Sequence, residues 1–378
     1  MKVRQGISFL LIISILAFLT YRNYNNRLYD WDMPGYLGSM FTTEFPGQLD
    51  KVRELTYSSI KKEAPADQYL HLIGISPHAI PRQYFAENTQ SFTEQLPYFQ
   101  IKIGYVLVIT LFYKLGLSPP MSVLFTGLLS YFLSGLLIFY IINILFPEKY
   151  LLAVLLTTGI MLFPTITFMS GESTPDMFIF LFILIFMIGL IKKWSQWRIF
   201  LLLLAMTFIR PDYITLALTY LGTVFIFYYF TEKKVIIALP VQGIVILLMY
   251  LFIMKFYNYP GWTDLFYDSF IDRRPIISAQ PAIVSLNTYL EIIGVKIIFF
   301  KKVTLSVFAI TGVIFWISKD AWIRMISVLF LVNVYIKFFF FPQSGDLRLF
   351  FPFIFPVFIM MLYTLSQKYK NSKILGIV

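Results

Sequence analysis

Residues 199–230 read IFLLLLAMTFIRPDYITLALTYLGTVFIFYYF, two apolar runs separated only by Arg210-Pro211-Asp212. Together they are too long for one ordinary transmembrane helix, which needs about 20 residues. A proline flanked by opposite charges breaks the run into two helices joined by a tight turn. The stretch therefore predicts a protein whose helices cross a membrane in succession with very short connections.

Similar apolar runs recur along the whole chain of 378 residues. The composition is 58% hydrophobic and only 13% charged, whereas a soluble domain is about half apolar and a quarter charged. We expect an all-α polytopic membrane protein with about 10 transmembrane helices, at residues 7–21, 121–146, 151–168, 177–191, 199–209, 213–230, 235–254, 303–318, 322–341 and 348–366.

Basic residues indicate the orientation of these helices. With ten spans, the short loops on one side hold clusters such as Lys192-Lys193 and Lys233-Lys234, and the short loops on the other side hold almost none. Cytoplasmic loops carry the excess of Lys and Arg. We therefore expect both termini on the cytoplasmic side of the membrane, and we expect this membrane to be a bacterial inner or plasma membrane. The net charge of +11 is ascribed to these loops, and no nucleic-acid partner is expected.

We interpret the chain as one integral-membrane domain, residues 1–378. Residues 1–21 form an uncleaved first transmembrane helix, because no small-residue cleavage site follows its apolar run. The remaining parts are a long extracytoplasmic loop (22–118), a helical bundle (119–254), a second extracytoplasmic loop (255–302) and C-terminal helices (303–378). Two apolar stretches with basic rims, 98–116 and 286–302, are expected to lie at the outer interface, although a spanning or re-entrant role stays open.

Two carboxylates, Asp30 and Asp32, follow the first helix closely and precede a Pro34-Gly35 turn signal. A turn can place both on one side, where one acts as a general base or both hold a divalent cation such as Mg²⁺ or Mn²⁺. The alternative is a helix-capping aspartate beside a solvated loop acid. The chain has no cysteine, which excludes thiolate metal sites and a cysteine nucleophile.

Three cations fall on the same outer side: Arg210, Lys337 and Arg348. A charge inside a span, as at Lys337, is costly and is a functional hypothesis by default. Together the three suit a lipid-linked phosphate. The alternatives are an Arg210–Asp212 pair at the turn, an Asp346–Arg348 pair, and a Lys337 side chain that snorkels to the headgroups.

Further acids lie on that side. Glu172 and Asp176 precede a span, where Asp176 suits the positive end of a helix and either residue can point into a shared outer cavity. Asp264, Asp268 and Asp272 recur at intervals of four, a spacing typical of a solvated helix face, although acids beside aromatic residues also suit carbohydrate.

The order of these motifs resembles the GT-C class of membrane glycosyltransferases, which use sugars carried on polyprenyl or dolichyl phosphate. The resemblance rests on Asp30-Trp31-Asp32 in the first outer loop, residues 172–176 before a middle span, Arg210-Pro211-Asp212, and Arg348 followed by Pro352 and Pro356. The leucine after Arg348 departs from the aromatic residue common there.

The resemblance implies a mechanism. Asp30, the acid nearer the span, would be the base for an acceptor hydroxyl with Asp32 as its partner, or the two would bind a metal, and the hydroxyl would attack the anomeric carbon with inversion. Arg210, Lys337 and Arg348 would stabilise the leaving phosphate. Glu172 and Asp176 are further candidates for substrate binding. The expected partners are a polyprenyl-phosphate sugar donor, a glycan, lipid or protein acceptor, and membrane lipids.

Two other functions remain open. An O-antigen-type polymerase or ligase of lipid-linked glycans would share the lipid substrate but would place its largest outer loop in the middle or late in the chain. A transporter or flippase would show internal repeats and polar residues near mid-membrane, and the sequence shows no convincing repeat.

Overall fold

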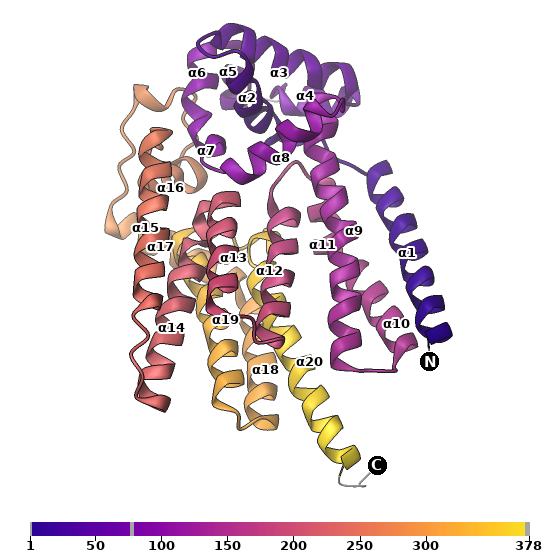
Figure 1. Cartoon of the computed structure of the whole chain (residues 1–378). Coiled ribbons are helices and arrows are strands. Elements are labelled where there is room, and N and C mark those ends of the chain that lie inside the picture. The colour runs from indigo at the N-terminus through magenta and orange to yellow at the C-terminus, as the bar shows by residue number, and fades with distance from the viewer. Residues whose placement is uncertain (1, 76–78, 375–378) are drawn as a thin grey trace.

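The computed structural model describes residues 2–75 and 79–374, and within these ranges the regular structure is entirely helical. Helices α2–α8 form a cap over one end of a bundle of longer helices (Figure 1). The cap helices are Met33–Glu44 (α2), Leu49–Glu63 (α3), Ala66–Leu72 (α4), Ile80–Glu87 (α5), Thr89–Gln95 (α6), Pro97–Gln100 (α7) and Ile103–Lys114 (α8).

The bundle contains every apolar run that the sequence predicts to span. Its helices are Lys2–Asn25 (α1), Pro119–Leu145 (α9), Tyr150–Met161 (α10), Pro164–Gly171 (α11), Asp176–Ile191 (α12), Gln196–Ile209 (α13), Ile214–Glu232 (α14), Ala238–Phe256 (α15), Leu286–Phe299 (α17), Lys301–Ile317 (α18), Ala321–Phe340 (α19) and Phe351–Ile374 (α20). Between α15 and α17, the short helix Trp262–Phe270 (α16) lies near the cap.

Within the described residues, six helices are long and apolar enough to cross a membrane, or up to nine spans if each of three bent pairs counts as one. The protein is thus a multi-pass helical membrane protein, with fewer straight spans than the ten runs suggest. The run 151–168 bends by 62° between α10 and α11, because Pro164 starts a new helix there. Helices α12 and α13 have only 16 and 14 residues.

The two stretches expected at the interface both contain sharp bends. The chain turns by 106° between residues 89–100 and α8, and by 65° between α17 and α18. Neither stretch continues as one straight helix into its neighbour. Their position relative to the lipid headgroups stays a prediction.

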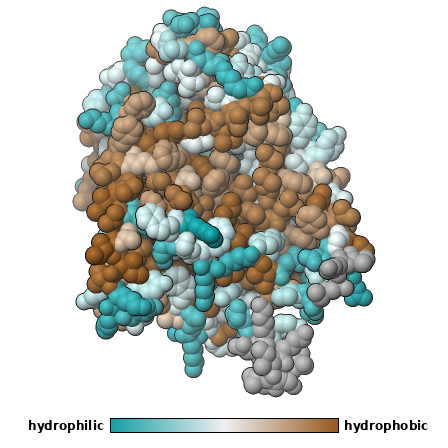
Figure 2. Space-filling model, viewed as in Figure 1, coloured by the Kyte–Doolittle hydropathy of each residue, from teal (hydrophilic) through white to brown (hydrophobic). Residues whose placement is uncertain are grey.

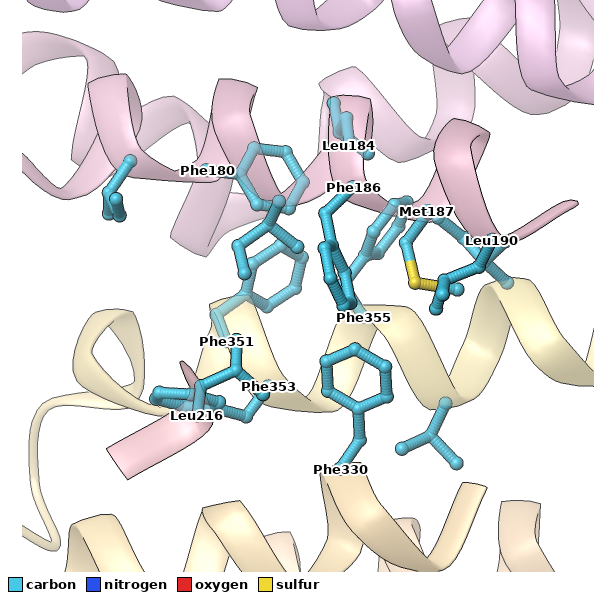
Figure 3. Close-up of a cluster of buried hydrophobic side chains, with 14 of the residues drawn as sticks. Phe180, Leu184, Phe186, Met187, Leu190, Leu216, Phe330, Phe351, Phe353 and Phe355 are labelled. Carbon is cyan, nitrogen blue, oxygen red and sulfur yellow. The ribbon is translucent and has the colours of Figure 1, made fainter. Parts of the chain in front are cut away.

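Helix α12 is the central element of the bundle. Twelve of its residues are buried, on all sides of the helix, as expected for a helix that is apolar all round. Phe180 on α12 packs against Phe351 and Phe355 of α20, with ring centroids 5.5 and 5.2 Å apart, and Phe186 meets Phe330 of α19 (Figure 3). This packing fixes the cap-facing end of α12, where Asp176 begins the helix.

The surface agrees with a membrane location. A broad apolar band crosses the middle of the face seen in Figure 2, with polar residues above it on the cap and below it at the opposite end. Large apolar side chains on the outer helices are exposed, among them Leu248, Phe252 and Trp316. Such a contiguous exposed apolar surface is typical of lipid contact.

The polar connecting segments of the bundle that carry the predicted site residues lie at the end that faces the cap. The backbone N–H of Leu28 donates to the carbonyl of Gly171 at 2.9 Å, which joins the α1–α2 linker to the α11–α12 loop. Figure 1 shows the α9–α10, α14–α15 and α18–α19 connections, the start of α1 and the end of α20 away from the cap. The basic clusters of the predicted inner loops therefore lie opposite the acidic motif.

Candidate functional site

A cavity of about 980 Å³ lies between the cap and the end of the bundle. Its size is at the upper end of the range of ligand pockets. The charged residues that line it come from the cap, from α12, α16 and α19, and from the connecting segments of the bundle: Asp32, Arg82, Lys102, Asp176, Arg210, Asp212, Asp268, Arg273, Lys337, Asp346 and Arg348. Most of the predicted site residues are thus brought to one place, although Asp32 and Arg348 are 316 positions apart in sequence.

Asp30 lies behind the cavity wall rather than on it. One carboxylate oxygen accepts the backbone N–H of Ser173 at 2.7 Å, and the other accepts the backbone N–H of Asp32 at 2.9 Å. The side chain therefore joins the acidic motif to the α11–α12 loop. Its contacts are those of a residue that holds backbone in place.

Asp32 lines the cavity with a carboxylate that has no hydrogen-bond or ion-pair partner among the described residues. It occupies the position before α2, but its side chain makes no capping bond. The capping alternative considered for this residue is therefore not realised. Of the two acids in the motif, Asp32 is the one available to a bound molecule.

The predicted cation cluster exists, but its charges are already paired. Arg210 forms ion pairs with Asp176 and, at 3.1 Å, with Asp212. Lys337 also pairs with Asp212, so the lysine does not snorkel to the headgroups.

Gly104 on α8 lies so close to Ile209 that a Cβ atom at this position would be 3.1 Å from the Ile209 amide nitrogen. The absence of a side chain on Gly104 thus lets the cap pack closely against the segment that carries Arg210.

Arg348 is paired in the same way. It contacts Glu172, and its Nε lies 2.7 Å from Asp346 and 3.7 Å from Asp176. Glu172 is buried in this ion pair and is not part of the cavity lining. Within the described residues, the three cations of the cluster thus meet four carboxylates, and the cluster as a whole carries no surplus positive charge for a phosphate.

The cap supplies cations that sequence reasoning did not assign to the site. Lys102 donates to the Tyr36 hydroxyl at 2.7 Å and lines the cavity, as do Arg82 and Arg273. None of the three has a carboxylate partner among the residues that the structure describes. A lysine placed just before the apolar α8 is a signal that could have identified Lys102.

Two acids of α16, Asp264 and Asp268, form ion pairs that hold the adjoining loop in place, and they do not form a solvated helix face. The Arg274 guanidinium lies 2.8 Å from both Asp264 and Asp268, and the Arg274 and Asp268 side chains are each only 1% exposed. Asp272 lies beyond the end of α16. The expectation of a solvated acidic helix face was wrong, because the loop that follows α16 folds back and delivers Arg274 to the acids.

A bound metal would have Asp30 and Asp32 as its nearest sequence candidates. In residues 2–75 and 79–374, no group of three or more His, Asp or Glu side chains is arranged to hold an ion. The pair fits a cation poorly on its own, since both Asp30 oxygens already accept backbone N–H bonds and only the Asp32 carboxylate is unengaged. We derive no step through a metal.

Burial raises the pKa of Asp30 to about 7, and the neighbouring Asp32 carboxylate adds to the effect. Burial likewise raises the pKa of Glu172 to about 8, against the opposing charge of Arg348. In an unfolded chain such groups titrate near 4. These two side chains therefore bind more protons in the folded protein than in the unfolded chain between about pH 4 and pH 8.

We expect stability to fall as pH rises through this window, by at most about 1.4 kcal/mol per pH unit for each group. Asp30→Asn removes one titrating group, so its unfolding temperature should depend less steeply on pH between 5 and 7. Thermal unfolding in detergent measures the slope. Glu54→Gln, at an exposed position of the cap, is the matched control and should keep the wild-type slope. Equal slopes in wild type and Asp30→Asn would contradict the raised pKa.

Comparison of the chain with protein-family models, curated proteins and solved structures gives no match. The resemblance to the GT-C class therefore stays a prediction from the sequence.

Proposed function

We propose that the protein is a membrane glycosyltransferase of the GT-C type, which moves a sugar from a polyprenyl-phosphate carrier to an acceptor hydroxyl. The observation that carries the proposal is the unpaired carboxylate of Asp32, which faces a large cavity at the cap end of a membrane-spanning bundle. A carboxylate without an internal partner is free to accept a proton from a bound hydroxyl.

The chemistry requires one proton acceptor and one stabilised leaving group. The acceptor hydroxyl gives its proton to Asp32 while its oxygen bonds to the anomeric carbon. The bond between that carbon and the phosphate oxygen breaks, and the polyprenyl phosphate leaves with the bonding electrons. Attack opposite the leaving group inverts the anomeric configuration.

Developing charge on the leaving phosphate needs a nearby cation. Lys102 lines the same cavity as Asp32 and has a neutral partner, the Tyr36 hydroxyl. It is therefore better suited to the phosphate than Arg210, Lys337 or Arg348, each of which already has carboxylate partners. We assign those three to holding the cavity wall.

The cavity also has an apolar side, which supports a lipid-linked donor. Tyr250 and Met254 of α15, Leu265 of α16, and Phe340 and Phe341 at the end of α19 line it. Burial of a prenyl chain against these side chains is favourable, whereas a nucleotide-sugar donor has no comparable apolar chain to bury there. We further propose that the cap faces the extracytoplasmic side of a bacterial inner membrane, in keeping with the distribution of Lys and Arg.

The test is to incubate the purified full chain in lipid nanodiscs with a panel of polyprenyl-phosphate sugars and candidate acceptors. Release of polyprenyl phosphate together with a glycosylated acceptor is the expected result. Parallel reactions with added Mg²⁺, added Mn²⁺ or a chelator test for a divalent cation. Polymerised lipid-linked glycan would favour a polymerase, and movement of the intact lipid between leaflets without transfer would favour a flippase; either outcome would overturn the proposal.

A further inference from the structure

Trp31, between the two acids of the motif, lies between two arginine side chains. The Arg82 guanidinium carbon is 5.0 Å from the Trp31 ring centroid, and that of Arg273 is 5.2 Å from it. Phe85 supports the arrangement, with its ring 5.3 Å from Trp31 and 5.4 Å from Arg273. Both distances to Trp31 are within the range of cation–π attraction. The two arginines reach this ring from different elements, α5 and the loop that follows α16.

Arg82 and Arg273 differ from the other arginines of the site because they meet no carboxylate among the described residues. Arg82 donates to the backbone carbonyl of His71 at 3.1 Å and also contacts the His71 ring. Arg273 contacts the Trp31 and Phe85 rings and lies within the field of Asp268 and Asp32 without a direct ion pair to either, while its neighbour Arg274 pairs directly with Asp264 and Asp268.

Both side chains are partly buried and line the cavity. A guanidinium removed from water without a counter-charge is costly to fold. Burial lowers the pKa of both groups, yet an arginine keeps its charge at neutral pH. Two partly buried cations whose direct contacts are with neutral groups are therefore suited to an anion that arrives with a ligand.

We propose that Arg82 and Arg273 form a binding site on the cap wall for an anionic group of the phosphate class carried by a substrate. A guanidinium group donates two parallel hydrogen bonds to a pair of phosphate oxygens. Because both side chains already stack on Trp31, they lose less conformational entropy when the phosphate binds. The site deepens the proposed function and rests on it, because it implies that one substrate brings a phosphate to the cap wall of the cavity. That phosphate belongs to the lipid donor or to the acceptor.

The test measures binding directly, without sugar transfer. The purified full chain in detergent is titrated by calorimetry with farnesyl phosphate, with farnesol, and with glycerol 1-phosphate, which has no prenyl chain. We expect Arg82→Gln and Arg273→Gln each to weaken phosphate binding by about tenfold, equivalent to about 1.4 kcal/mol. Farnesol binding should not change. Arg198→Gln removes an exposed arginine in the first turn of α13, at the opposite end of that helix from Arg210, and is the matched control for net charge.

The result also separates the two sources of the phosphate. Weaker binding of farnesyl phosphate in the two variants supports the site and assigns it to the donor, while weaker binding of glycerol 1-phosphate alone supports the site and assigns it to the acceptor. Unchanged affinity for both phosphates, in variants with wild-type unfolding temperatures, overturns the site. Arg273→Lys keeps the charge but loses the fork and should fall between wild type and Arg273→Gln. Phosphate binding without any sugar transfer would overturn the proposed function and leave this site standing.

Discussion

Asp32→Asn is expected to lower the rate of sugar transfer by about 10²–10⁴-fold, the usual contribution of a general base. Asparagine has nearly the same shape as aspartate but cannot accept the proton of the acceptor hydroxyl. The carboxylate of Asp32 makes no hydrogen bond or ion pair to the rest of the described protein, so the unfolding temperature should stay close to that of the wild type. The measurement is turnover of a confirmed donor, with thermal unfolding in parallel.

Asp30→Asn is the matched comparison. In the wild type, the two Asp30 oxygens accept the backbone N–H groups of Ser173 and Asp32. Asparagine has one oxygen that can still accept one of these N–H groups, but its NH₂ group then faces the second one and cannot accept from it. We expect a smaller loss of rate through a displaced Asp32. A full loss in Asp30→Asn combined with normal turnover in Asp32→Asn would reverse the two roles and make Asp30 the base.

Arg274→Met is expected to cost about 3–5 kcal/mol of stability, the usual result of removing one partner of a buried ion pair. The change leaves Asp268, whose side chain is 1% exposed, without its counter-charge, and it also removes the bonds to the carbonyls of Ile277 and Gln280. Denaturant or thermal unfolding in detergent measures the loss.

A double variant tests whether the cost comes from the stranded charge. Asp268→Asn combined with Arg274→Met should be more stable than Arg274→Met alone, since no bare carboxylate is then buried. Arg273→Met is the control for losing an arginine at the adjacent position and should cost much less. Equal losses in Arg273→Met and Arg274→Met would contradict the different roles that we assign to the two residues.

The bundle could be predicted from the sequence because hydropathy determines which segments avoid water. Each apolar run is helical in the structure, including the two on either side of Arg210-Pro211-Asp212, although the run 151–168 forms two helices. The bends were not predictable in the same way. The length of an apolar run, as at 151–168, does not reveal that Pro164 redirects the chain, since a proline also occurs inside the continuous helix α20, at Pro356.

The site was predictable at the level of segments but not of side chains. Counting the membrane crossings along the chain was enough to predict that Asp32, Arg210, Lys337 and Arg348 lie at the same end of the bundle. The sequence could not reveal that Asp212 pairs with Lys337, because the two are 125 positions apart and their contact depends on how α14 and α19 pack.

The same limit applies to the adjacent pairs of similar residues. Asp30 and Asp32 differ in role because one meets the backbone of the α11–α12 loop and the other faces a cavity. Arg273 and Arg274 point to an aromatic ring and to two acids, respectively. Such differences follow from the direction of a side chain within a loop, which composition and spacing do not specify.

The joint between α1 and the α11–α12 region also bears on how the protein is made. Asn23 donates to the Ser170 hydroxyl at 2.8 Å, across a separation of 147 residues, and Asp30 meets Ser173 next to it. A ribosome adds roughly 5–20 residues per second, so α1 resides in the bilayer for about ten seconds or longer before its partner emerges. During that interval Asn23 has to find water or lipid headgroups, and a membrane chaperone that recognises polar groups on unpaired helices would meet α1 in this state.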